Sequence, residues 1–397
     1  MRLLLILFFS LSTLSADTID TLIAQAFKKH PSLDAIQQRL AQMDTRISLS
    51  QKWADPDVSL NINDIQFGDP LSRDLEPMQY QAISAKQQFP WFGKLEAKKI
   101  YALSQKKEIL DSYAMAKVTL AKEIRLSAYT IKELNERIKI LHKYKIVSQQ
   151  NIELYTSYAS TQNKSHSSSV TASLLLSQLK IREERYKAIL AQQKAKLTYL
   201  LQKKVSSVVS SLDISKPKSL QYYLHRLPNN PSYIMQESKQ KTAHAQQTLS
   251  DLAHTPDPYV KVGYFNRQEY ADYASVNVGI SLPIYGRQED QSEISRLAIL
   301  EANSAILDYN SSLKSEIERM HITLNEAYHI YNIIQNESLP QIAHMFDLSQ
   351  ASIQNGADLF AYTRLLEEKL ALEEERIAIQ ATYWRTQAQL NALIGEI

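Results

Sequence analysis

Apolar side chains recur every three or four residues in two long stretches of the chain, and charged residues occupy most positions between them. The apolar positions are Ile131, Leu134, Ile138 and Leu141 in the first stretch, and Ile317, Met320, Leu324, Ala327, Tyr331 and Ile334 in the second. This spacing is typical of the narrow seam along which coiled-coil helices pack. The pattern therefore predicts long helices that lie along neighbouring helices.

Proline and glycine, the residues that most often interrupt helices, are absent from a long region around the first of these stretches. No proline occurs between Pro90 and Pro217, and no glycine occurs between Gly93 and Gly263. Residues 94–203 can therefore be almost wholly helical. A helix from Lys94 to about Tyr158 would be roughly 100 Å long, at about 1.5 Å per residue. A compact core cannot hold such a helix.

Four short segments instead show the alternation of apolar and polar residues that is typical of strands. They are residues 58–63, 79–89, 259–266 and 276–282, and they form two predicted hairpins at about 57–90 and about 257–284. The first segment changes phase near Asp64, which predicts a bulge there. Asp55-Pro56 precedes the first hairpin and Thr255-Pro256-Asp257-Pro258 precedes the second, and these prolines end the preceding helices.

The two hairpins belong to an internal duplication. Pro31 recurs as Pro231, Asp55-Pro56 as Asp257-Pro258, and the strand-exit motif at 89–94 as residues 282–287, always at an offset between 191 and 202 residues. The predicted organisation is a signal peptide at 1–16, a first repeat at 17–203, a linker at 204–219 and a second repeat at 220–397. Each repeat contributes a helix, a hairpin and a long helical hairpin.

An apolar run with one positive charge and small residues at its end makes residues 1–16 a predicted export signal. No later stretch approaches the roughly 20 apolar residues of a transmembrane helix, so a membrane-embedded part would have to consist of strands. Four strands are too few to close a barrel, since the smallest outer-membrane barrels need about eight. We therefore expect several copies to share one barrel.

Composition excludes several classes of site. The chain has no cysteine, which excludes disulfides, thiolate metal sites and an N-terminal lipid on cysteine. The net charge of +3 gives no electrostatic reason to expect a nucleic-acid partner. The nine histidines fall in no ligand pattern, and no nucleophile, phosphate-loop or paired-carboxylate signature occurs. We therefore expect no catalytic residue, no bound metal and no cofactor.

The chain resembles the TolC family of outer-membrane factors over essentially its whole mature length. The features that carry this resemblance are Pro31 and Pro231, the strand-exit motif with Pro90, Trp91 and Gly93, its repeat with Pro283 and Gly286, Leu339-Pro340, Asn355-Gly356 and the closing residues 390–395. The resemblance implies a mainly α fold with a membrane β-barrel portion, in which a homotrimer forms twelve strands and a helical tunnel. It also implies contact with outer-membrane lipid, a periplasmic adaptor and an inner-membrane pump of the RND type.

The resemblance also places candidate functional residues at the ends of the helical hairpins. Asp358, Arg364 and Glu367 are candidates for a charged periplasmic aperture, although the second acidic position of the family is here Thr363 or Arg364. The hairpin tips, with Ser165 and His166 in one and Asn355 and Gly356 in the other, are candidates for adaptor contact. The alternative interpretation is that the acidic residues have no role in an aperture and lie on a helix face that is exposed to solvent.

The predicted function is a passive exit duct of a tripartite efflux system for small molecules, with heavy metals as one possible cargo suggested by the Pro-Trp-Phe-Gly-Lys motif. Two alternatives stay open. The same fold serves as the exit duct of type I protein secretion, and a periplasmic coiled-coil adaptor or structural protein would also have long helices. An adaptor, however, would need a Gly-rich β-domain for which the sequence gives no sign.

Overall fold

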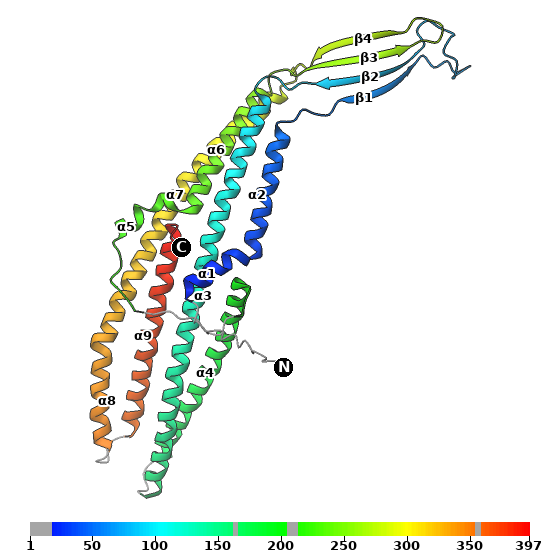
Figure 1. Cartoon of the computed structure of the whole chain (residues 1–397). Helices are drawn as coiled ribbons and strands as arrows, with labels where there is room; N and C mark the ends of the chain where they lie inside the picture. Colours follow the sequence, from blue (N-terminus) through cyan, green and yellow to red (C-terminus); the bar gives the residue numbers. More distant parts are fainter. Residues whose placement is uncertain (1–17, 162–165, 205–212, 354–358) are drawn as a thin grey trace, which may run out of the picture. The chain divides into compact units, whose positions relative to one another are not determined.

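The computed structural model describes residues 18–161, 166–204, 213–353 and 359–397. The predicted signal peptide, residues 205–212 of the linker, and the candidates Ser165, Asn355, Gly356 and Asp358 lie outside the described residues. The chain is mainly helical and carries one antiparallel sheet of four strands (Figure 1). The predicted fold class is confirmed.

The elements, in chain order, are divided between the two predicted repeats. In the first repeat they are α1 (Ile19–Lys29), α2 (Pro31–Ser50), β1 (Asp57–Asn63), β2 (Tyr80–Gln88), α3 (Lys94–Thr161) and α4 (His166–Leu201). In the second they are α5 (Leu220–Leu224), α6 (Pro231–Leu252), β3 (Pro258–Asn266), β4 (Tyr273–Ile280), α7 (Arg287–Ile333), α8 (Leu339–Ile353) and α9 (Leu359–Leu393). Both α2 and α6 begin on the repeated prolines, where the missing N–H costs no hydrogen bond.

The chain divides into two compact units. The first combines the residues up to Asp34 with Ala114–Pro231 and Ser311–Ile397. Its core contains a cluster in which α3, α4 and α9 meet, made of Leu141, Tyr144, Leu175, Leu179, Leu366 and Leu370. The seam positions Ile317, Leu324 and Ala327 of α7 are also buried. The apolar spacing of the sequence thus marks the packed side of these helices.

A short π-helical segment, Ile334–Ser338, joins α7 to α8. Pro340 follows directly, and its ring cannot donate a hydrogen bond and collides with the carbonyl four residues earlier in a regular helix. Widening the preceding turn relieves that collision without ending the helix. The Leu339-Pro340 pair therefore produces a local change of helix pitch.

The second unit consists of Ala35–Tyr113 and Ser232–Asn310 and contains the sheet. Small polar side chains pack α6 against α7: the Ser250 and Ser295 hydroxyls are 2.8 Å apart, and Gln247 donates to Ser292 at 2.9 Å. The sheet order is β1-β2-β3-β4, so the two hairpins lie side by side and β2 pairs with β3. The strands β1 and β4 form the two edges.

The bulge predicted near Asp64 is not present. Strand β1 ends at Asn63, and Asp64 takes a left-handed backbone with φ of 56° instead. The change of phase in the sequence therefore marks the end of the strand. Aspartate tolerates this conformation better than most residues because its short side chain bonds locally, and here it accepts a hydrogen bond from Gln66 at 2.9 Å.

Candidate functional site

The register of the sheet separates apolar from polar side chains onto two faces. Val58 lies opposite Ala85, Ala85 lies opposite Val262, and Val262 lies opposite Val276. Directly opposed residues share a face, and alternate residues along each strand share it too. This places nine exposed apolar or aromatic side chains on one face, namely Val58, Leu60, Ile62, Ile83, Val262, Tyr264, Val276, Val278 and Ile280.

That apolar face is unusually exposed for side chains of its kind. Leu60 has 82% of its surface exposed and Val278 has 74%. A contiguous apolar surface of this kind is rare on a protein surrounded by water and marks contact with a membrane or a partner. We call it the apolar sheet face below.

The opposite face, called the polar sheet face below, carries hydroxyl, amide and ammonium groups. The Ser59 and Ser84 hydroxyls are 2.9 Å apart, and Lys86 lies opposite Lys261. The ammonium of Lys86 stands 4.4 Å from the ring centre of Tyr259. That ring covers Gly279 so closely that a Cβ there would come within 2.5 Å of it, so a larger residue would have to displace the ring.

Both loops beyond the strands hold themselves together through buried or charged side chains. In the first loop, Arg73 is buried and donates to the carbonyls of Asn63 and Pro70 at 3.1 and 2.7 Å. In the second, the Tyr264 hydroxyl and the Arg267 backbone N–H both donate hydrogen bonds to Asp272. These bonds, the one from Tyr264 most strongly, hold the pKa of the Asp272 carboxyl below its usual range.

The strand-exit motif holds the sheet onto the helices. Gly93 turns the chain with φ of +89° and leads directly into α3. The Lys94 ammonium and the Trp91 backbone N–H then both donate to Asp257, at 2.7 and 2.8 Å. In the repeat of the motif, Gly286 also has a positive φ, +72°, and directly precedes α7. The predicted motif residues Pro90, Trp91, Gly93, Pro283 and Gly286 thus lie in the two segments that lead from a strand into the following helix.

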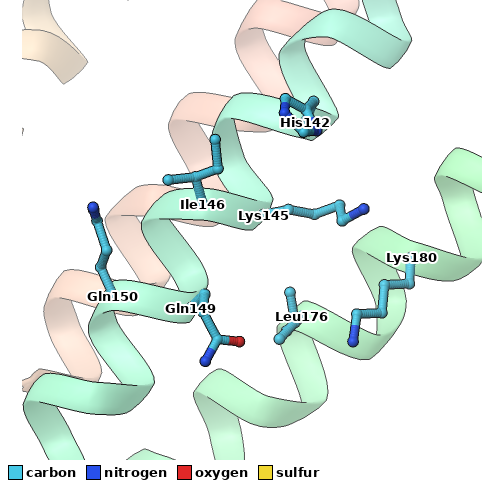
Figure 2. Close-up of a pocket in the computed structure, with 7 residues that line it drawn as sticks. All are labelled: His142, Lys145, Ile146, Gln149, Gln150, Leu176 and Lys180. Carbon is cyan, nitrogen blue, oxygen red and sulfur yellow. The ribbon is translucent and has the colours of Figure 1, made fainter.

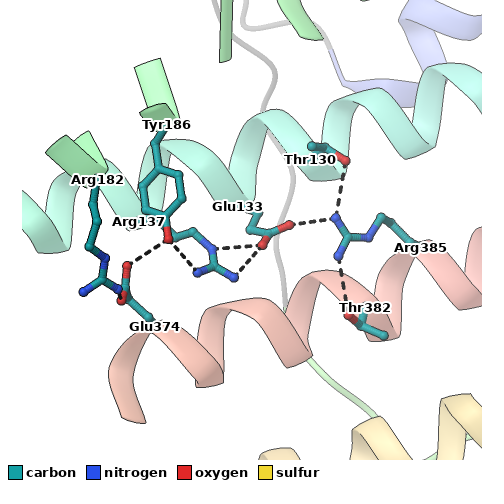
Figure 3. Close-up of polar contacts among 8 residues, drawn as sticks. All are labelled: Thr130, Glu133, Arg137, Arg182, Tyr186, Glu374, Thr382 and Arg385. Carbon is teal, nitrogen blue, oxygen red and sulfur yellow. Dashed lines mark hydrogen bonds and ion pairs between the residues drawn. The ribbon is translucent and has the colours of Figure 1, made fainter. Parts of the chain in front are cut away.

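A polar network joins three helices of the first unit (Figure 3). Glu133 of α3 accepts from Arg137 of the same helix at 2.9 Å and from Arg385 of α9 at 2.7 Å. Arg385 also reaches the hydroxyls of Thr130 and Thr382 at 3.5 and 3.4 Å. The carboxyl of Glu133 is only 10% exposed, so both of its oxygens depend on these guanidinium partners.

The network continues to α4. Arg137 donates to the Tyr186 hydroxyl at 3.2 Å, and that hydroxyl donates to Glu374 of α9 at 3.1 Å. Arg182 also forms an ion pair with Glu374. Helices α3 and α4 of the first repeat are therefore tied to α9 of the second by charge-assisted hydrogen bonds, which are stronger than neutral ones.

A shallow hollow lies between α3 and α4 (Figure 2). Its volume is about 290 Å³, and it is lined by His142, Lys145, Ile146, Gln149, Gln150, Leu176 and Lys180. Lys145 donates to Glu183 at 2.5 Å, and this bond, followed by the one from Lys187, lowers the pKa of Glu183. The lining is basic and apolar, and it includes no carboxylate.

The described aperture candidates lie on α9. Arg364 and Glu367 are both exposed, and Arg364 pairs with Glu368 at 3.3 Å. Glu367 has no ion-pair partner among the residues that the structure describes. His166, a candidate for adaptor contact, is the first residue of α4.

None of the helices described is long and apolar enough to cross a membrane. Within the same ranges, no three histidine, cysteine, aspartate or glutamate side chains come together in a way that could hold a metal ion.

The chain matches known proteins in its structure but not in its sequence. No protein-family model matches it, and no curated protein matches it. Among solved structures it matches VceC, an outer-membrane protein of Vibrio cholerae, with a TM-score of 0.79 and 15% identity over 95% of this chain and 96% of that one. It also matches CmeC, an outer-membrane channel of Campylobacter jejuni, with a TM-score of 0.78 and 12% identity over 95% and 85% of the two chains.

A third match is CusC, whose crystal structures concern folding and transmembrane channel formation. Its TM-score is 0.75 at 13% identity, over 96% of this chain and 92% of that one. These matches span nearly the whole of both chains, sheet and helices together. The chain therefore has the TolC-like fold of outer-membrane channels.

Proposed function

We propose that this chain is one subunit of an outer-membrane efflux channel and acts as a passive duct with no chemistry of its own. The observation that carries the proposal is the division of the sheet into an apolar face and a polar face. Membrane barrels alternate in this way because one face meets lipid and the other meets an aqueous lumen. The apolar sheet face would contact the lipid, and Lys86 and Lys261 would face the lumen.

A single copy cannot form such a channel. The sheet has four strands and two free edges, and an unpaired strand edge in lipid leaves backbone groups unsatisfied at several kcal/mol each. Three copies would supply twelve strands in a closed ring. The trimer is supported by the match to TolC-like structures, and the long helices would then continue the duct on the periplasmic side.

The proposed partners are a periplasmic adaptor and an inner-membrane pump of the RND type. The hairpin ends, including His166, would meet the adaptor. The hollow between α3 and α4 supports this arrangement, because its lining combines the basic Lys145 and Lys180 with the apolar Ile146 and Leu176, and an acidic or amphipathic helix could cover it. The cargo would be small molecules, with metal ions as a possible class.

The direct test is to express the full-length protein in a Gram-negative host and separate its membranes. We expect the protein in the outer-membrane fraction, with a gel mobility that changes on heating, and stepwise ion conductance after reconstitution in planar bilayers. Release of the whole protein by osmotic shock, without conductance, would contradict the channel. Co-purification with an adaptor and an RND pump supports efflux, whereas recovery of only a secretion ATPase complex would favour the type I alternative.

We also propose that α9 supplies charge to a periplasmic aperture, together with Asp358. Threefold symmetry would present each exposed Glu367 three times, and rings of carboxylates favour cations. Glu367→Gln is expected to reduce cation selectivity, measured as the reversal potential across a salt gradient. The matched control is Glu368→Gln, whose carboxylate is already paired with Arg364. Equal reversal potentials for both variants and the parent would exclude Glu367 from the aperture.

A further inference from the structure

The junction between the two repeats shows how the end of one repeat recognises the start of the next. Strand β2 pairs with β3, with Ala85 opposite Val262 and Lys86 opposite Lys261. The Phe89 backbone N–H donates to the Pro258 carbonyl at 2.8 Å just beyond the strands. The side-chain contact that completes the junction is the ion pair of Lys94 with Asp257, which is largely shielded from water, with side-chain exposures of 11% and 26%.

Every part of this junction has an equivalent on the two free edges. The repeat of Gly93-Lys94 is Gly286-Arg287, which follows β4, and the repeat of Asp257-Pro258 is Asp55-Pro56, which precedes β1. Arg287 and Asp55 are both exposed. Neither has an ion-pair partner in the part of the chain that the structure describes. The edges thus carry the two halves of a contact that a single copy leaves unmade.

We propose that β4 of one copy pairs with β1 of the next in the register of the β2–β3 junction, and that Arg287 binds Asp55 of the partner subunit. In the internal duplication β4 is the repeat of β2, and β1 is the counterpart of β3. The register of β2 with β3 therefore places Val278 opposite Leu60 of the partner subunit and Asn277 opposite Asn61 of the partner subunit. This inference rests on the proposed channel, and it specifies the subunit interface of that channel.

The polarity of the side chains on the two edge strands supports the same register without reference to the repeat. Val276, Val278 and Ile280 would continue the apolar sheet face into Ile62, Leu60 and Val58 of the partner subunit. A slip by one residue would turn the whole strand over and place polar side chains in the apolar face. The guanidinium of Arg287 can also bind a carboxylate through two parallel hydrogen bonds, which a lysine cannot do.

Disulfide trapping tests the register, and the natural chain contains no cysteine to interfere. Asn61→Cys/Asn277→Cys places the two thiols directly opposite each other on the polar sheet face, where an aqueous oxidant can reach them. In the β2–β3 junction Phe89 is hydrogen-bonded to Pro258, the residue directly opposite it, and opposed pairs then alternate between hydrogen-bonded and non-hydrogen-bonded. The pairs on the polar sheet face are the non-hydrogen-bonded ones, whose Cα atoms lie only about 4.5 Å apart. We expect cross-linked dimers and trimers on a non-reducing gel.

The matched controls are Ser59→Cys/Asn277→Cys and Asn63→Cys/Asn277→Cys, which keep the same face but shift one thiol by two residues. Such diagonal positions lie about 7–8 Å apart, too far for a disulfide without backbone movement. We expect their cross-linking to be slower by about tenfold or more. A control that links as fast as the proposed pair would overturn the register.

Charge exchange tests the ion pair separately. Arg287→Asp is expected to lower the temperature at which the oligomer dissociates in detergent, and Asp55→Arg combined with Arg287→Asp is expected to restore it. Failure of restoration would overturn the ion pair. A trimer that conducts ions but shows no Asn61–Asn277 link would overturn only this interface, whereas a monomer released by osmotic shock would overturn the proposed function itself.

Discussion

Val276→Arg is expected to prevent assembly of the protein into the outer membrane. Val276 lies near the middle of β4 on the apolar sheet face, with 68% of its side-chain surface exposed. An arginine on the lipid face near the bilayer centre costs about 2–4 kcal/mol. Three copies would each bear that cost. The measurement is the fraction of protein recovered in the outer membrane as a heat-modifiable oligomer.

Ser275→Arg is the matched control for this change, because Ser275 is the neighbouring residue in the same strand and lies on the polar sheet face. It lies opposite Gly263 across the sheet, and the ring of Phe265 packs over that glycine. We expect Ser275→Arg to assemble nearly as well as the parent. Equal loss of assembly in both variants would show that β4 merely tolerates no bulky cation, and equal assembly would show that the apolar sheet face does not meet lipid.

Glu133→Ala is expected to lower the stability of the first unit markedly. The change removes the carboxylate that Arg137 and Arg385 share and leaves two guanidinium groups facing each other. Removing one partner of a buried charge pair costs about 3–5 kcal/mol, and the 30% exposure of Arg385 reduces our expectation to about 2–3 kcal/mol. The measurement is the midpoint of guanidinium unfolding of the detergent-solubilised protein, followed by circular dichroism.

Glu123→Ala is the matched control for the network. Glu123 also joins two helices through a charge pair, with Lys196 at 2.7 Å, but its side chain and that of Lys196 are 32% and 46% exposed. Exposed pairs of this kind contribute less than about 1 kcal/mol. A shift for Glu123→Ala as large as that for Glu133→Ala would contradict the importance of burial in the network.

The sequence was most informative where structure follows from local spacing. The three-and-four apolar repeat marked buried positions such as Ile317 and Leu324, and the period-two segments marked the strands. Gly93 and Gly286 were recognisable because both precede a helix in the same motif. In each of these cases the physical cause lies within a few residues of its effect.

Contacts between distant residues were not predictable from one sequence. Nothing in the sequence around Arg182 of the first repeat indicates that this residue pairs with Glu374 of the second. Arg73 lies between two predicted strands and Gln79 begins a predicted strand, and nothing in the sequence indicates that both are buried and bind backbone groups of the loop. The Lys94–Asp257 pair could have been suspected from the repeat, because both residues stand at repeated positions.

The recurrence of the strand-exit motif, with Gly93 and Gly286 each at the start of a long helix, bears on the evolution of the molecule. If the junction inside the chain and the junction between chains use the same chemistry, a chain of one repeat would close the same ring from six identical copies. Each association step costs roughly 4–15 kcal/mol in lost translational and rotational freedom. Fusion of two repeats removes three of those steps, so gene duplication alone would have favoured assembly before any new contact evolved.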